Sequence, residues 1–328
     1  MLAAKALTAI ITVLIGVSAA LVLYWLLNKL AEILPERMEA RLKPFLYILP
    51  AYVAIVFYLV YPAVQTIIYS FKDSASQNWV GWQNYTSLLS NSGFQQTLLN
   101  TLLWMVVVPV VTVALGLGVA VLADRLNPRA ESTAKTIIFL PMAISMVGAG
   151  TVWKFVYDYA PAGRPQIGLQ NAIVTGLGHA PVPWLQQQQF HFNSFLLMVM
   201  LLWAQVGFSM VLLSAAVKGV PGDTLEAARI DGAGERQIFF SVVVPQIWGT
   251  IITVFITTLI SVMKIFDIIY VMTNGNFNTN VLGNEFFNQL FKNFNNGASS
   301  AIVVMLLIAM IPIMIYQVRH FRNEEAAA

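Results

Sequence analysis

The sequence contains no cysteine, which excludes both a disulfide framework and a metal site built on thiolates. Charged residues make up only 10% of the chain, a share that soluble domains rarely have. The net charge of +3 is too small to indicate a nucleic-acid partner. The histidines are scattered over two expected loops and a tail without the spacing of metal ligands, so we expect no metal site. They are His179, His191 and His320.

A nucleotide-binding signature is also missing. No glycine is followed by lysine anywhere in the chain, so the Gly-x4-Gly-Lys-Ser/Thr loop that cradles phosphates is absent. The segments between the hydrophobic runs are shorter than the roughly one hundred residues that a nucleotide-binding domain needs. We therefore expect no catalytic residues and no cofactor bound by this chain. If the protein takes part in active transport, ATP must be bound by a partner.

Hydrophobic residues, by contrast, make up 58% of the chain, and the mean hydropathy is +0.72. Because about 20 apolar residues cross a bilayer as a helix, the sequence predicts an all-α integral membrane protein. The first run is longer than the apolar part of a secretory signal and ends in an interfacial Tyr24-Trp25 pair and Lys29, so we expect it to be retained. The seven expected spans are residues 7–28, 46–70, 98–123, 137–157, 195–217, 247–272 and 299–318.

Lysine and arginine residues are distributed unevenly between the two sides that these spans define. If segments 29–45, 124–136, 218–246 and the C-terminus face the cytoplasm, they hold twelve of the 18 basic residues. The opposite side holds four, and two lie within spans. This asymmetry follows the positive-inside rule. We therefore expect the N-terminus outside, and the C-terminus and the loop 218–246 in the cytoplasm.

The segment 219–245 is the most informative stretch of the chain because it is polar and patterned between two apolar spans. Asp223, with Glu226 three residues later, forms a capping-box-like pair that predicts a helix start. The glycines around Gly232 then predict a break before a second helical stretch. A compact helix–turn–helix at the membrane surface is typical of a docking element. The apolar side of its first helix is expected to consist of Leu225, Ala228 and Ile230.

This loop resembles the signature of bacterial ABC-importer permeases, which reads EAA, three residues, Gly, nine residues, then I-x-L-P. The only departures are valines at the isoleucine and leucine positions. The matching residues are Glu226-Ala227-Ala228, Gly232 and Val242-Val243-Val244-Pro245. The resemblance implies that a separate ATPase, which binds ATP and magnesium, pushes on this loop. The coupling residues it implies are Glu226, Ala227, Ala228, Asp231, Gly232 and Pro245.

From about residue 45 to residue 316 the chain resembles the sugar branch of this family, the maltose-, trehalose- and glycerol-phosphate-type permeases. The order of several short motifs along the chain carries this resemblance. They are Leu49-Pro50, Tyr61-Pro62, the run from Trp79 to Tyr85, Asn100-Thr101 at the opening of a span, the segment from Gly168 to Leu185, and the run from Phe266 to Thr273.

The resemblance implies a six-span core at 46–318 with the coupling loop 218–246, preceded by an extra span and connector at 1–45 and followed by a tail at 319–328. It also implies the lipid bilayer of a bacterial cytoplasmic membrane, a second similar permease, two ATPase subunits and an extracytoplasmic solute-binding protein. The family imports sugars, glycosides and polyols. Since the likeness to α-glucoside-type permeases is strongest, we expect a di- or oligosaccharide or a glucosyl osmolyte.

The path of the solute is expected near the bilayer midplane, where polar side chains are costly and usually functional. In span 247–272, four residues at helical spacings 0, 3, 4 and 7 predict one stripe, and the family resemblance places the sugar site of maltose-type permeases there. The stripe is less polar here, so either the partner permease supplies more of the contacts with the solute or this chain only walls the cavity. Its members are Thr258, Ser261, Val262 and Ile265, and three residues of span 195–217 align with the same site: Trp203, Gly207 and Met210.

Two further features leave alternatives open. Lys264 and Asp267 lie three residues apart. They either pair across one helical turn, or contact the solute or form part of the outer gate. The segment 274–297 contains nine asparagines in 24 residues, which either bind a sugar hydroxyl or a binding protein or belong to a solvated, turn-rich loop; the composition favours the loop.

Other functional classes fit the sequence less well than an importer of sugars. A permease of the same type for a non-sugar solute shares every feature of the loop. An ion-coupled secondary transporter is expected to bury carboxylates in several spans, whereas the spans here offer essentially Asp267 alone. A membrane scaffold without transport activity would differ from an importer permease in having no ATPase partner.

Overall fold

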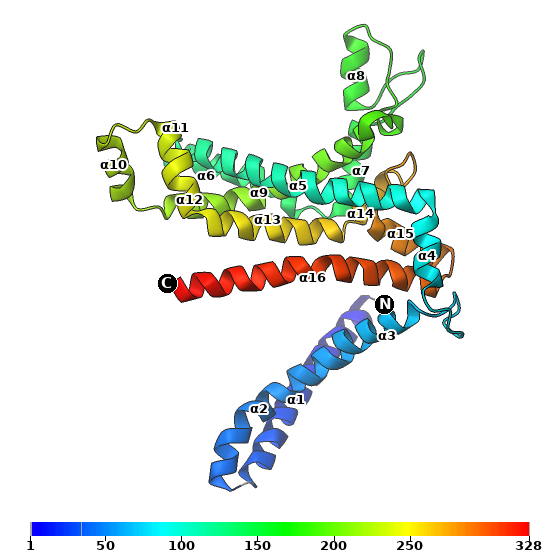
Figure 1. Cartoon of the computed structure of the whole chain (residues 1–328), viewed down its shortest axis with the longest axis vertical. Helices are drawn as coiled ribbons and strands as arrows, with labels where there is room; N and C mark the ends of the chain where they lie inside the picture. The colour runs from blue at the N-terminus through cyan, green and yellow to red at the C-terminus, as the bar shows by residue number, and fades with distance from the viewer. Residues whose placement is uncertain (1, 34, 328) are drawn as a thin grey trace. The chain divides into compact units, whose positions relative to one another are not determined.

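The computed structural model describes residues 2–33 and 35–327. Apart from an isolated bridge between Lys72 and Trp79, all regular structure in these ranges is helical. Five of the described helices are long and apolar enough to cross a membrane, and counting two sharply bent pairs as one span each gives seven. The expected all-α membrane architecture is therefore confirmed (Figure 1).

The chain divides into two units, of which the first ends at Ile68. This unit is a helical hairpin in which the rings of Tyr24 and Tyr47 stack with centroids 5.8 Å apart, and the Tyr47 hydroxyl donates to Asn28 Oδ1 at 2.9 Å. It contains the expected span 7–28 and nearly all of the expected span 46–70 within continuous helical stretches, the second of which ends at Tyr69. The functional boundary expected after residue 45 stays a prediction. The helices are α1 (Leu2–Glu32), α2 (Glu36–Ile55), a π-helical turn (Val56–Val60) and α3 (Tyr61–Tyr69).

The second unit begins at Tyr69 and holds the other elements. Its long helices α5, α9 and α16 contain the expected spans 98–123, 195–217 and 299–318. The α-helices are α4 (Gln83–Ser90), α5 (Ser92–Asp124), α6 (Pro128–Phe139), α7 (Met146–Val156), α8 (Leu169–Gly176), α9 (Phe192–Lys218), α10 (Gly222–Ile230), α11 (Glu235–Ile238), α12 (Val244–Gln246), α13 (Trp248–Met263), α14 (Asp267–Met272), α15 (Leu282–Phe287) and α16 (Asn296–Ala327). The shorter turns are 3-10 helices at Leu140–Ala143, Trp184–Gln186 and Gln189–His191, and π-helices at Phe239–Val243 and Asn288–Lys292.

The core of this unit forms where α5 lies along α9 and α13 (Figure 1). Trp104 of α5 and Met200 of α9 are fully buried there, together with Ile269 of α14. Gly116 lets the two long helices approach closely, because a Cβ at this position would lie 2.2 Å from Ser209 Oγ. Small residues at such contacts allow close packing where lipid supplies no hydrophobic driving force.

The expected span 137–157 is not one continuous helix. The stretch Pro128–Ala143 and helix α7 are bent by 103° relative to each other. Pro141 lies in the 3-10 turn before the bend, and Ser145 then caps α7 by accepting a hydrogen bond from the Gly148 N–H at 3.1 Å. A new N-cap stops one helix and starts another, which a hydropathy window does not detect.

The expected span 247–272 is also broken. At its start, α12 and α13 belong to stretches that are bent by 70° around Ile247. At its end, α13 stops at Met263 and α14 begins only at Asp267. Gly283 packs directly against the second break, where a Cβ would lie 2.4 Å from the Ile265 carbonyl oxygen. Gly283 is distant from Ile265 in the sequence, so the local sequence pattern could not indicate this contact.

The asparagine-rich segment 274–297 is not the solvated loop that the composition favours. It contains α15 and a π-helical turn, and it is tied to α5 by buried polar groups. Asn100 donates to the carbonyls of Asn278 at 2.6 Å and Asn280 at 2.9 Å, and the Leu282 N–H donates to Thr101 Oγ1 at 3.0 Å. The sequence suggests that Asn100-Thr101 opens a span. In the structure this pair lies inside α5 and anchors the asparagine-rich segment to that helix.

Candidate functional site

The coupling loop contains a short helix with a well-defined end. In α10, the Gly232 N–H donates to the Arg229 carbonyl and the Ala233 N–H donates to the Ala228 carbonyl, each at 3.0 Å. This is the Schellman arrangement, which needs a left-handed residue after the helix. Gly232 has φ +84°, a conformation that glycine adopts without strain. The break predicted at Gly232 is confirmed.

The start of α10 differs from the expected capping box. The N-cap is Pro221, which makes no side-chain capping bond, and Asp223 lies inside the first turn. Its carboxylate is placed where it complements the positive end of the helix dipole. The predicted reciprocal bond between Asp223 and Glu226 is therefore wrong, because Pro221-Gly222 begins the helix earlier than the spacing suggests.

The two faces of α10 have opposite environments. Leu225 and Ala228 pack against a buried cluster that includes residues of α5, α9 and α13. Glu226 and Ala227 are exposed, and Ile230 is 86% exposed. The expectation that Ile230 shares the apolar side with Leu225 and Ala228 is thus wrong. The outward face combines a carboxylate, a small residue and a bare aliphatic side chain, which suits it to docking on another protein.

The root of the loop is embedded in the transmembrane helices. Val220, Ile238 and Val243 are buried in the same cluster as Met210 of α9 and Val254 of α13. The π-helical turn at Phe239–Val243 precedes Pro245, whose ring and missing N–H disturb the regular hydrogen-bond ladder. The coupling loop and the helices α5, α9 and α13 therefore share one packed cluster of side chains.

An ion cluster at the same end of the unit was not foreseen from the sequence. Glu131 of α6 accepts from Lys135 at 2.5 Å and from Lys218 at 2.6 Å, and Lys218 lies 3.5 Å from Asp124 of α5. Lys135 also donates to Ser214 of α9. Sequence spacing alone indicates only the i,i+4 pair of Glu131 and Lys135, because the other partners are distant in the chain. The cluster ties α5, α6 and α9 together four residues before α10.

Neutralising the centre of this cluster is expected to loosen the coupling region moderately. Glu131→Gln removes the carboxylate that Lys135 and Lys218 share, and Lys218 keeps only the longer contact with Asp124, so we expect a melting temperature about 2–5 °C lower in detergent. Asp124→Asn is the matched control, since the one ion-pair partner of Asp124 among the described residues is Lys218, at 3.5 Å. A melting temperature unchanged by Glu131→Gln, or lowered equally by Asp124→Asn, would contradict this role.

The residues expected along the solute path differ in accessibility. Thr258 and Val262 are buried within the chain, and the Thr258 hydroxyl donates to the Val254 carbonyl of its own helix at 2.9 Å. Ser261 is exposed. Ile265 lies beyond the end of α13, so the stripe of four expected on one helix does not extend to it. The role of these residues in solute binding stays a prediction.

On α9, the three aligned residues have distinct packing roles. Trp203 is half-buried and meets Trp153 of α7 edge to face, with centroids 5.9 Å apart. Gly207 contacts the end of α6, where a Cβ would lie 2.4 Å from the Ile138 carbonyl oxygen. Met210 is fully buried. Of these three residues only Trp203 has a partly exposed side chain, and its binding role stays a prediction.

Lys264 and Asp267 are separated by the break between α13 and α14 and do not pair. Both are exposed, and no ion pair joins them within the described residues 35–327. The structural pair considered from the sequence is therefore wrong, because it presumes a continuous helical turn. Contact with a solute or a gate stays a prediction for both residues.

Comparisons with known proteins agree with this architecture. Residues 116–322 match the family described as the inner membrane component of binding-protein-dependent transport systems. The alpha-glucoside transport system permease protein AglF of Rhizobium meliloti is 43% identical over 96% of this chain and 97% of its own length. The osmoprotective compounds uptake permease protein GgtC of Synechocystis sp. is 47% identical over 85% of this chain and 99% of its own.

A solved structure shows the same fold at lower identity. A chain of a bacterial ABC transporter involved in the import of the acidic polysaccharide alginate superposes with a TM-score of 0.75, covering 88% of this chain and 99% of that chain at 18% identity. The resemblance read from the coupling loop and the later motifs is thus confirmed. The chain belongs to the family of inner membrane components of binding-protein-dependent transport systems, the permease subunits of ABC importers.

Proposed function

We propose that this permease couples import to ATP hydrolysis by docking a separate ATPase on the outward face of α10. One observation carries the proposal: α10 exposes Glu226, Ala227 and Ile230 while its other face is packed into the transmembrane core. Displacement of a docked ATPase then moves α9 and α13 as rigid bodies and alternates access to the solute path. ATP and magnesium are bound by the ATPase.

The solute that we propose is an α-glucoside, a di- or oligosaccharide, or a glucosyl osmolyte. The relatives named for alpha-glucosides and for osmoprotective compounds support this class, since both are more than 40% identical over most of the chain. Trp203, with its half-buried ring, supports it chemically because an indole face packs well against the C–H face of a sugar.

The proposed assembly contains this chain, a second similar permease, two ATPase subunits and an extracytoplasmic solute-binding protein. We propose a bacterial cytoplasmic membrane as its location, with the N-terminus outside and α10 in the cytoplasm. The distribution of lysine and arginine supports this orientation. It places α10 on the side where ATP is available.

The test is purification of the tagged chain from gently solubilised native membranes, with mass spectrometry of what is retained. We expect an ATPase and a second permease, and an ATPase activity that rises when the sugar-loaded binding protein is added. Recovery of this chain alone, with no associated ATPase activity, would overturn the proposal in favour of a secondary transporter or a scaffold.

A further inference from the structure

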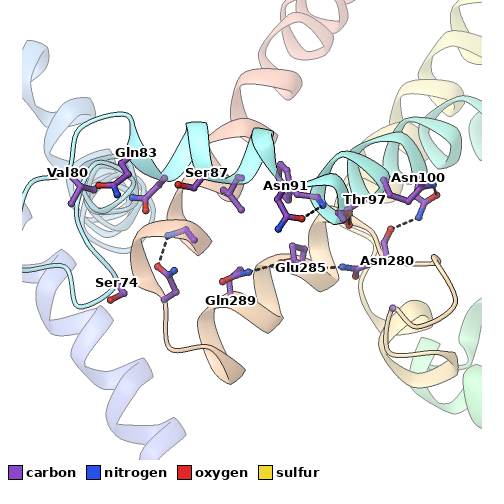
Figure 2. A pocket seen from close by; sticks show the side chains of 18 of the residues that line it. Ser74, Val80, Gln83, Ser87, Asn91, Thr97, Asn100, Asn280, Glu285 and Gln289 are labelled. Carbon is purple, nitrogen blue, oxygen red and sulfur yellow. Dashed lines mark hydrogen bonds between the residues drawn. The ribbon is translucent and has the colours of Figure 1, made fainter.

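A polar cavity is lined in part by residues of α4 and α15 (Figure 2). These two helices lie at the end of the second unit that is remote from α10 (Figure 1). It measures about 660 Å³ and is formed by α4, the first turns of α5 and the segment 275–298. Pockets for small molecules commonly have about 300–1,000 Å³, so a disaccharide-sized ligand fits this volume. None of the residues expected along the midplane solute path lines this cavity.

The lining is dominated by carboxamides. Nine of the 20 lining residues are asparagine or glutamine, and they come from both sides of the cavity. A carboxamide offers two donors and an acceptor, which matches a hydroxyl group that donates and accepts at once. The composition of the lining therefore suits a ligand with many hydroxyl groups.

Part of this lining is held in place by hydrogen bonds within the wall. The Glu285 carboxylate accepts from Asn280 at 2.7 Å and from Gln289 at 2.8 Å (Figure 2). Behind this wall, Asn284 donates to Asn280 Oδ1 at 2.8 Å. Gly275 closes the wall with φ +80°, where a Cβ would lie 2.7 Å from Asn280 Oδ1. A preorganised wall lowers the conformational cost of binding.

The charge of the cavity selects against anions. Its charged lining residues are Asp73 and Glu285, and no lysine or arginine of the described chain lines it. The Gln77 N–H and the Asn78 amide hold the pKa of Asp73 below its ordinary value, so this carboxylate is ionised at neutral pH. Sugar phosphates and acidic sugars are repelled, whereas a neutral polyol donates hydroxyl hydrogens to such carboxylates.

Several polar groups that line the cavity remain available to a ligand. The side chains of Gln83 and Ser87 make no hydrogen bond within the described residues 35–327. Gln96 uses its amide N–H toward Asn100 at 3.2 Å, which leaves its carbonyl oxygen free. Phe94 and Leu88 provide an apolar floor for C–H groups. Together they form the mixed surface on which sugars bind.

We propose that this cavity is a second carbohydrate site, specific for neutral di- or oligosaccharides and glucosyl polyols, which holds the solute at the end of the permease opposite the coupling loop. The inference rests on the proposed import of such solutes. The asparagine-rich segment and Asn100 would then bind the solute before it enters the path at the bilayer midplane.

The test is direct binding of trehalose, sucrose and glucosylglycerol to the full-length chain in nanodiscs, measured by saturation-transfer NMR, with glucose 6-phosphate as the anionic comparison. We expect saturable binding of at least one neutral probe and none of the phosphate. Ser87→Trp fills the cavity and is expected to weaken binding at least tenfold, whereas Thr86→Trp, on the neighbouring exposed position that does not line the cavity, retains it.

A second pair of variants distinguishes a direct loss of binding from a loss caused by misfolding. Gln96→Leu removes a lining amide and is expected to weaken binding about fivefold, the effect of one hydrogen bond, while Gln95→Leu, outside the lining, leaves binding unchanged. Absence of binding of all three sugars to the wild type, or wild-type binding by both Ser87→Trp and Gln96→Leu, would overturn the inference. A different result would speak against the proposed function alone: the chain binds sugar in this assay but retains no ATPase on purification.

Discussion

Replacing Gly232 by proline is expected to abolish uptake, to less than about one hundredth of the wild-type rate, while the chain still inserts into the membrane. Proline requires φ near −65°, whereas Gly232 has φ +84°, and the change also removes the N–H that bonds to the Arg229 carbonyl. The end of α10 would then turn differently, and its outward face would no longer meet the ATPase. Uptake of labelled sugar and the amount of chain in the membrane measure the two effects.

Gly234→Pro is the matched control, because Gly234 has φ −72°, a value that proline adopts. It is expected to keep most of the uptake. Glu226→Lys tests the docking face itself by reversing an exposed charge, and we expect the same loss of uptake with normal insertion. Wild-type uptake by Gly232→Pro or by Glu226→Lys would contradict the coupling role of this loop.

Gly116→Val is expected to destabilise the transmembrane core more than any surface change. The new Cβ would lie 2.2 Å from Ser209 Oγ and 3.1 Å from the Met210 nitrogen, so α5 and α9 must move apart. Overpacking of this kind costs about 1–3 kcal/mol, which corresponds to a melting temperature about 3–9 °C lower for a unit of this size. Thermal unfolding followed by size-exclusion chromatography in detergent measures it.

Gly118→Val is the control on the same helix, because a Cβ at Gly118 meets nothing within 4 Å. We expect its melting temperature to stay within about 2 °C of the wild type. Equal destabilisation by both substitutions would mean that valine lowers stability through helix propensity alone and that the close approach of α5 and α9 is not structurally important.

The sequence predicts well what depends on local physics. Long apolar runs place the helices because burying a backbone in lipid leaves few alternatives to an α-helix. The glycine at 232 marks the end of α10 because only a left-handed residue completes the Schellman motif. The coupling loop and the family therefore follow from residues that lie close together in the chain.

What escapes the sequence depends on contacts between distant residues. The break at Ile265 is packed against Gly283, so the stripe from Thr258 to Ile265 fails although its spacing is helical. Asn100 binds carbonyl groups about 180 residues further along the chain, and this turns an apparent loop into a wall of the polar cavity. Pairing of Glu131 with Lys218 is equally invisible to local patterns.

The contact that we propose between α10 and a separate ATPase can be tested directly, because the chain contains no cysteine. Ala227→Cys labelled with a benzophenone maleimide is irradiated in native membranes, with Ser90→Cys, an exposed position at the other end of the unit, as control. We expect a covalent adduct between this chain and an ATPase from position 227 and none from position 90. No adduct from position 227, or equal adducts from both positions, would contradict it.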